Sequence, residues 1–289
     1  MLQFDFFQLE GSEPGHSAIV FLCGRFGNGK WGAKEYRHML ECFNKTTILG
    51  VTPYNDRGMV EWYPAPNSSI DQDDAVNGQS HARERIERIL SIVEQIYKVP
   101  RSRTILAGFS AGAVMSVYTN ANNEKEPLGG ILSHAGAILR PDQLPAANEH
   151  NINTPILLMH GRKDHCFDWY ERYVPMKNAL IDKGYPVSVV EHFGYHQMYD
   201  IEIIMAGLFM HKVLGYEKFT DIYDDDINEY GLTVEDAQKE EIPLKEYMRL
   251  GIATDEQKRA YYAELEERHK AFRAKEEEDE ELVSVKEDA

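Results

Sequence analysis

One serine stands in a sequence that could make its hydroxyl a nucleophile. Residues 103–112 read Arg-Thr-Ile-Leu-Ala-Gly-Phe-Ser-Ala-Gly, so an apolar run leads directly into a G-x-S-x-G sequence centred on Ser110. In such a turn between a strand and a helix, the serine backbone is strained and the flanking glycines leave room for the tight crossing. The pattern predicts an exposed Ser110 hydroxyl, able to attack a carbonyl carbon.

A serine hydroxyl is a weak nucleophile, so it needs a histidine to accept its proton and a carboxylate to orient that histidine. Asp164 follows the apolar run 155–160, and His196 follows the β-like run 187–192. Since open α/β sheets build their sites at the carboxyl ends of strands, both side chains are expected near Ser110. We predict a triad of Ser110, Asp164 and His196, in the chain order of α/β-hydrolases.

Each partner of the serine has a neighbouring rival. Asp168 could replace Asp164, but it begins a predicted helix, where an acidic N-cap explains it. His192 could replace His196, but it lies at the strand end, whereas His196 lies past Gly194 in a loop that can reach across. The sequence therefore favours Asp164 and His196 and leaves the rivals open.

The elements that must position these residues alternate along the chain up to about Gly215. Strand-like runs with near-continuous apolar residues are separated by helical patterns, the clearest of which spans residues 86–97. This alternation predicts a mainly parallel central sheet with helices on both faces. Together with the chain order of Ser110, Asp164 and His196 it indicates the α/β-hydrolase fold, and the absence of a long insertion between the strands predicts no large cap domain. The runs span residues 18–23, 46–51, 103–107, 129–134, 155–160 and 187–192, with an antiparallel edge strand expected over 3–10.

The acidity of the chain is concentrated at its end. Residues 216–289 hold 24 acidic and 11 basic residues, which account for most of the net charge of −17. We predict a hydrolase domain over 1–215 and an acidic, partly helical extension over 216–289, whose last ~15 residues are disordered. Such a field disfavours nucleic acid and anionic membrane surfaces. Binding of a protein partner and a merely solubilising role remain equal interpretations of the extension.

Other composition signals exclude several classes of protein. Three cysteines without a C-x-x-C pair indicate reduced thiols, and Cys23 is expected as a small buried side chain. The chain shows no signal-like N-terminus or membrane-spanning run, so we expect a cytoplasmic protein. The glycines over 24–32 lack nucleotide-loop spacing, and the acidic residues over 224–235 lack the glycine of a calcium loop. No cofactor and no metal are predicted, and the oligomeric state is left open.

Three short motifs resemble one branch of the α/β-hydrolases. Gly-Phe-Ser-Ala-Gly at 108–112 resembles the Gly-Phe-Ser-Gln-Gly of the carboxylesterase, phospholipase and acyl-protein thioesterase branch. His-Gly-Arg-Lys-Asp at 160–164 matches its His-Gly-x-x-Asp, and Gly-Tyr-His at 194–196 resembles its last motif. The resemblance covers about 17–215. It implies a serine carboxylic-ester hydrolase that acts on esters or thioesters through an acyl-enzyme.

An oxyanion hole needs two backbone N–H donors, and losing one typically costs on the order of 3 kcal/mol of transition-state stabilisation. One donor is expected from Ala111, the residue after the nucleophile. The other is expected from the loop over 23–29, where Cys23 replaces the histidine of the family's His-Gly-Leu-Gly. Either Arg25 or Phe26 supplies it, and the sequence leaves both open.

Two further segments resemble substrate-contacting loops. Trp62 and Tyr63 lie in an aromatic and proline-rich stretch, in the place where the resembling enzymes carry an acyl-contacting loop. Leu139 lies in a second stretch that could form the opposite lip of a shallow pocket for a small-molecule or acyl-chain substrate. The alternative is that both stretches are packed surface loops.

Two functions from different classes follow. The first is the serine esterase described above. The second is a catalytically weak or inactive binding protein on a hydrolase frame, which acts through its acidic extension. The intact set of Ser110, Asp164 and His196 favours the first, whereas the altered loop over 23–29 keeps the second open.

Overall fold

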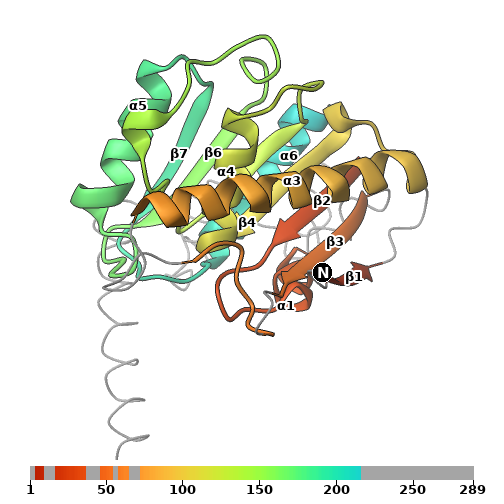
Figure 1. Ribbon diagram of the computed structural model, residues 1–289, viewed down its shortest axis with the longest axis horizontal. Helices are drawn as coiled ribbons and strands as arrows, with labels where there is room; N and C mark the ends of the chain where they lie inside the picture. The colour runs from red at the N-terminus through yellow and green to blue at the C-terminus, as the bar shows by residue number, and fades with distance from the viewer. Residues whose placement is uncertain (1–3, 10–16, 37–45, 55–57, 65–71, 216–289) are drawn as a thin grey trace, which may run out of the picture. The chain divides into compact units, whose positions relative to one another are not determined.

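The computed structural model describes residues 4–9, 17–36, 46–54, 58–64 and 72–215, and these form a twisted sheet between two layers of helices (Figure 1). Within these residues the sheet has seven strands in the order β1-β3-β2-β4-β5-β6-β7. β1 pairs antiparallel with β3, and the other neighbours pair in parallel. The strands are β1 (Phe4–Leu9), β2 (Ser17–Leu22), β3 (Thr46–Pro53), β4 (Thr104–Phe109), β5 (Gly130–His134), β6 (Ile156–Gly161) and β7 (Val187–His192).

Helices cover both faces because successive residues of each central strand point to opposite sides. Val20 of β2 packs in the core cluster that includes Ile86 of α3, whereas its neighbour Phe21 packs in the cluster that includes Ala33 of α1 and Met210 of α6. The helices are α1 (Gly29–Glu35), α3 (Gln72–Ile96), α4 (Ala111–Ala121), α5 (Val174–Asp182) and α6 (Asp200–Leu214), with short turns of helix over Arg101–Arg103, Pro141–Gln143 and Trp169–Tyr173.

The architecture predicted from the sequence is confirmed. Every predicted strand is present with its ends shifted by at most two residues, and the antiparallel edge strand lies where it was expected. The 86–97 pattern belongs to α3, whose residues Ile86, Ile89 and Val93 are buried, whereas Ile96 at its end is exposed. The acidic extension over 216–289, with the candidate calcium loop, lies outside the described residues.

The parallel order places the carboxyl ends of β4, β6 and β7 at one edge of the sheet. The loops that follow these three strands begin at residues 110, 162 and 193. They carry the serine, aspartate and histidine that the sequence singled out. The fold therefore brings together residues that are up to 86 positions apart in the chain.

Candidate active site

Ser110 lies at the junction of β4 and α4. Its backbone has φ 55° and ψ −120°, a conformation that residues other than glycine rarely adopt. The flanking glycines make this turn possible. A Cβ on Gly108 would lie 2.3 Å from the carbonyl carbon of Gly112, and one on Gly112 would lie 2.0 Å from the carbonyl oxygen of Leu22. Both obstacles are backbone atoms, so neither position can accept a side chain without moving the sheet or the helix.

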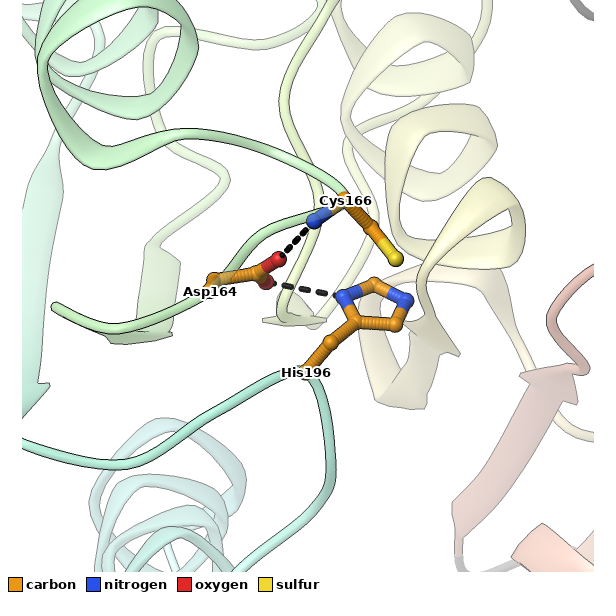
Figure 2. Close-up of side chains that lie close together, drawn as sticks. All are labelled: Asp164, Cys166 and His196. Carbon is orange, nitrogen blue, oxygen red and sulfur yellow. Dashed lines mark hydrogen bonds and ion pairs between the residues drawn. The ribbon is translucent and has the colours of Figure 1, made fainter.

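The structure brings Ser110, His196 and Asp164 into a continuous hydrogen-bonded chain. His196 Nε2 lies 2.9 Å from Ser110 Oγ, and His196 Nδ1 lies 2.8 Å from Asp164 Oδ2. Figure 2 shows the Asp164 carboxylate facing the imidazole ring. Since an ionised carboxylate only accepts, a neutral His196 donates from Nδ1 to Asp164 and accepts the serine proton at Nε2. This is the tautomer that a general base requires.

Asp164 is buried and fully hydrogen-bonded. Its Oδ1 accepts from the N–H groups of Cys166 and Phe167 at 2.8 and 2.9 Å. Burial would raise the pKa of the carboxyl group, but the hydrogen bonds from His196 and from the Phe167 N–H outweigh burial and lower the pKa below its usual value. Asp164 is therefore a fixed negative charge beside the imidazole near neutral pH.

The two rival residues are engaged elsewhere. Asp168 Oδ1 accepts from the N–H groups of Tyr170 and Glu171 at 2.8 and 2.9 Å, so it caps the helical turn that follows. His192 Nε2 lies 2.7 Å from Glu202 Oε1, and its Nδ1 accepts from the Gly194 N–H. Both side chains therefore bind partners other than Ser110 and His196.

The two candidate oxyanion donors in the early loop differ in whether the N–H group already has a backbone hydrogen bond. The Phe26 N–H donates to the Val60 carbonyl oxygen at 2.9 Å, and Phe26 has a positive φ of 58° with an exposed side chain. Within the described residues the Arg25 N–H makes no such backbone bond, and the Arg25 side chain is held by Glu61 at 2.7 Å. Of the two alternatives, Arg25 has the N–H group available for a ligand.

The other candidate donor, Ala111, occupies the first turn of α4. The N–H groups of a first turn have no partner inside their helix, and the helix dipole makes this end electropositive. Gly24, next to Arg25, lies against the serine, since a Cβ placed on it would be 3.2 Å from Ser110 Cβ. The loop and the start of α4 therefore border the same space at the serine.

Cys23 begins this loop and is buried as expected. Its side chain is 2% exposed, and burial raises the pKa of its thiol to about 12, outweighing the opposite effect of a backbone hydrogen bond. A thiol with such a pKa is protonated near neutral pH, so Cys23 acts as a packing residue rather than as a nucleophile.

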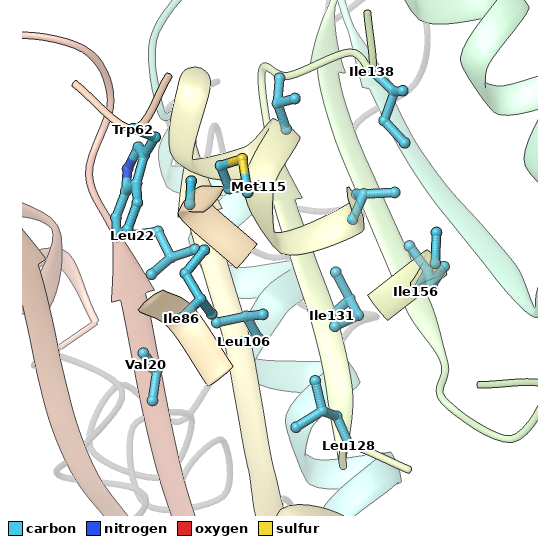
Figure 3. Packing of buried hydrophobic residues seen from close by; sticks show 14 of the residues in the cluster. Val20, Leu22, Trp62, Ile86, Leu106, Met115, Leu128, Ile131, Ile138 and Ile156 are labelled. Atoms are coloured by element: carbon cyan, nitrogen blue, oxygen red, sulfur yellow. The ribbon is translucent and has the colours of Figure 1, made fainter. Parts of the chain in front are cut away.

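The three residues predicted to contact substrate lie in the core. Trp62 is 3% exposed, Tyr63 6% and Leu139 8%, and Figure 3 shows Trp62 near Leu22 and Met115 of the same cluster. The Trp62 indole N–H donates to the Cys23 carbonyl oxygen at 2.9 Å. Trp62 therefore fixes the start of the early loop from the core. This arrangement favours the alternative that the stretch around Trp62 is a packed surface loop.

Residues 10–192 match the profile that defines the phospholipase/carboxylesterase family. The chain belongs to this family. A family relative, acyl-protein thioesterase 1 of Aspergillus fumigatus, is 40% identical over 224 residues, which cover 70% of this chain and 90% of that protein. Acyl-protein thioesterase 1 homolog 1 of Dictyostelium discoideum is 27% identical over 52% of this chain and 70% of that protein.

Solved structures show the same fold. The crystal structure of esterase PE8 matches 73% of this chain and 99% of its own with a TM-score of 0.65 at 22% identity. The Bacillus cereus carboxylesterase matches 73% of this chain and 94% of its own with a TM-score of 0.60 at 17% identity. This phospholipase/carboxylesterase family member therefore has the α/β-hydrolase fold. None of its described helices is long and apolar enough to cross a bilayer.

This family member also has a buried polar network that the sequence did not reveal. Glu202 of α6 lies between two histidines, with Oε2 2.7 Å from His134 Nδ1 and Oε1 2.7 Å from His192 Nε2. His134 Nε2 lies 2.5 Å from the Tyr36 hydroxyl, and Gly194 N–H donates to His192 Nδ1. If both imidazoles are neutral, each ring nitrogen, both Glu202 oxygens and the Tyr36 hydroxyl have a hydrogen-bond partner within this network.

The charge of Glu202 is stabilised by these bonds. Burial would raise the pKa of the carboxyl group, but the hydrogen bonds from His134 and His192 lower the pKa to about 2. The network also reaches the site, since the His134 carbonyl oxygen accepts from the Ser110 N–H at 2.9 Å and Gly194 precedes His196 by two residues. A glutamate inside the apolar run 201–208 is the one signal that could have indicated it.

Proposed function

We propose that the protein is a serine hydrolase that cleaves carboxylic ester or thioester bonds through Ser110, His196 and Asp164. The observation that carries the proposal is the position of His196, which lies within hydrogen-bonding distance of both the elbow serine and a buried aspartate. The family relatives are named as thioesterases, which supports the same class of reaction.

In this mechanism Ser110 Oγ attacks the carbonyl carbon while His196 Nε2 takes its proton. Asp164 holds the tautomer and stabilises the imidazolium that forms. The Ala111 and Arg25 N–H groups receive the oxyanion of the tetrahedral intermediate. His196 then gives its proton to the leaving alcohol or thiol, which leaves an acyl-enzyme. Water, deprotonated by His196, attacks the acyl carbon, and the carboxylic acid departs with Ser110 regenerated.

The surroundings of His196 favour an apolar acyl group. The rings of Phe109 and Phe167 lie 5.0 and 5.8 Å from the imidazole, and Trp31 lies 6.3 Å from Phe109 with half of its side chain exposed. Aromatic surface beside the nucleophile can cover an acyl chain and exclude water from the ester bond. We therefore assign carboxylic acyl groups with apolar chains as the substrate class.

Labelling by a fluorophosphonate probe tests the nucleophile. We expect the parent protein to be labelled, and Ser110→Ala and His196→Ala to lose labelling, since the probe needs an activated serine. A panel of p-nitrophenyl esters and acyl thioesters of increasing chain length then defines the substrate, with longer chains preferred over acetate. A folded parent that neither labels nor turns over would overturn the proposal in favour of the binding protein.

Substitutions at residue 25 test the second oxyanion donor. Arg25→Pro removes the backbone N–H, and we expect it to lower kcat by about 10²- to 10³-fold, the typical effect of losing one donor. Arg25→Ala is the matched control, because it keeps the N–H and removes only the side chain, with its contacts to Glu61 and to the Phe26 ring. Thermal unfolding checks that both variants fold. Equal losses in the two variants would show that the side chain, not the N–H, is what matters.

A further inference from the structure

Cys166 places a sulfur atom beside the histidine and aspartate of the candidate site. Figure 2 shows the Cys166 sulfur and the Asp164 carboxylate both directed toward the His196 ring. One ligand atom from each residue lies within 4.8 Å of the others. The Cys166 N–H donates to Asp164 Oδ1 at 2.8 Å, so the turn that holds the carboxylate also fixes the cysteine.

The types of these three ligands select a class of metal ion. Thiolate sulfur, imidazole nitrogen and carboxylate oxygen are the ligands of Zn²⁺, at distances of about 2.0 to 2.3 Å, which puts the ligands of a tetrahedral site about 3.5 Å apart. The three atoms need to move by only about 1 Å to reach such a spacing. Mg²⁺ and Ca²⁺ take oxygen ligands, so the sulfur disfavours them.

A divalent cation can also reach these three side chains from solvent, and the negative charge of Asp164 attracts it. Cys166 is exposed and His196 is partly exposed, so an ion can enter from solvent and keep a water molecule as its fourth ligand. Partial burial and the negative charge of Asp164 raise the pKa of the Cys166 thiol. The same negative charge attracts a divalent cation, which compensates for the thiolate that forms on binding.

We propose that Cys166, His196 and Asp164 form an inhibitory Zn²⁺ site. On binding, the Cys166 sulfur loses its proton to solvent and forms a bond to the metal. If His196 binds through Nδ1, the ring proton moves from Nδ1 to Nε2 and the bond to Asp164 is lost. If it binds through Nε2, the proton stays on Nδ1 and the bond to Ser110 is lost. In both cases the hydrogen-bonded chain that activates the serine is broken. The inhibition rests on the proposed function, whereas the binding does not.

Zinc binding is measured first, without any need for activity. The metal-free full-length chain is titrated with Zn²⁺ by calorimetry as the parent, as Ser110→Ala, and as Cys166→Ser, which keeps the size of the side chain and removes the soft ligand. We expect one site of micromolar or tighter affinity in the first two and at least tenfold weaker binding in Cys166→Ser. The exposed histidine of α3 gives the control His81→Ala, which should bind like the parent. Equal binding by Cys166→Ser and the parent would overturn the proposal.

Inhibition is measured second, as hydrolysis of a p-nitrophenyl ester at buffered free Zn²⁺. We expect the parent to lose activity as the site fills, to regain it with a chelator, and to be unaffected by the same concentration of Mg²⁺. Cys166→Ser, compared with its own rate without metal, should need at least tenfold more Zn²⁺. A parent that binds Zn²⁺ through Cys166 and hydrolyses no ester contradicts the proposed function alone. An active parent that keeps its rate with the site filled contradicts the inhibitory role.

Discussion

Ser110→Ala lowers kcat for ester hydrolysis by about 10⁶-fold, to the level that substrate binding and the oxyanion donors support without a nucleophile. The methyl group keeps the Cβ and tolerates the same positive φ, so the elbow and the helix that follows retain their geometry. The loss is therefore expected in the chemical step, with thermal unfolding changed by no more than about 1 kcal/mol for the missing hydrogen bond to His196.

The matched control for this experiment is Ser102→Ala, which changes an exposed serine just before β4 and should keep the parent rate. Pre-steady-state kinetics of the parent should show a burst of product if the acyl-enzyme accumulates. A folded Ser110→Ala variant that keeps more than roughly a hundredth of the activity would assign the reaction to another residue, because removal of a serine nucleophile typically costs on the order of 10⁶ in kcat.

Glu202→Ala destabilises the protein by about 3 to 5 kcal/mol, the cost of removing one partner of a buried charged network. The change leaves the N–H groups of His134 and His192 without an acceptor in the core, and each such orphan costs about 1 to 3 kcal/mol. Glu202→Gln should be milder, because its amide can accept from His192 and donate to His134 once that ring changes tautomer. The measurement is the free energy of unfolding in denaturant.

Glu94→Ala, at an exposed position of α3, is the control and should fall within about 0.5 kcal/mol of the parent. The pH dependence gives a second measurement. The folded pKa of Glu202 is about 2 and the ordinary value is 4.5, so its contribution is present above pH 4.5 and is lost as pH falls toward 2. The difference between parent and Glu202→Gln should shrink over that window. A difference independent of pH would show that the charge of Glu202 does not stabilise the fold.

The fold was predictable because its signals are local. Apolar strands such as 155–160 alternate with helical patterns such as 86–97, and each pattern is readable without knowing its partners. The approach of Ser110, Asp164 and His196 followed from the same reading, since each residue lies in the loop that follows a strand and parallel strands end at one edge. Their catalytic roles stay a proposal until the substitutions above are made.

The sequence was less informative where a side chain's role depends on distant backbone atoms. The difference between Arg25 and Phe26 depends on the Val60 carbonyl oxygen, which accepts the Phe26 N–H. Trp62 was predicted to contact substrate because its stretch lies where the resembling enzymes carry an acyl-contacting loop, yet its side chain is buried and donates to the Cys23 carbonyl oxygen. A short loop cannot show in its own sequence which of its side chains turn inward.

The buried network was hidden for a related reason. Glu202 lies in an apolar helix and His134 ends a strand, and both positions are ordinary until the helix packs across the sheet end. The contact between Glu202 and His134 depends on the order of the strands and on the rotation of α6 about its axis. Neither can be predicted from the sequence of the two segments alone. Charged residues in apolar runs are therefore the positions at which long-range pairing should be sought first.

His134 has a double attachment whose consequence is mechanical. Its carbonyl oxygen holds the backbone of Ser110, and its ring holds Glu202, which in turn holds His192 at the base of the loop that carries His196. The loops that carry Ser110 and His196 are thus both attached to one buried hydrogen-bonded network. Because both loops are bonded to the same network, neither can unfold locally without breaking it. The loops that carry Ser110 and His196 should therefore unfold at the same temperature as the sheet rather than below it.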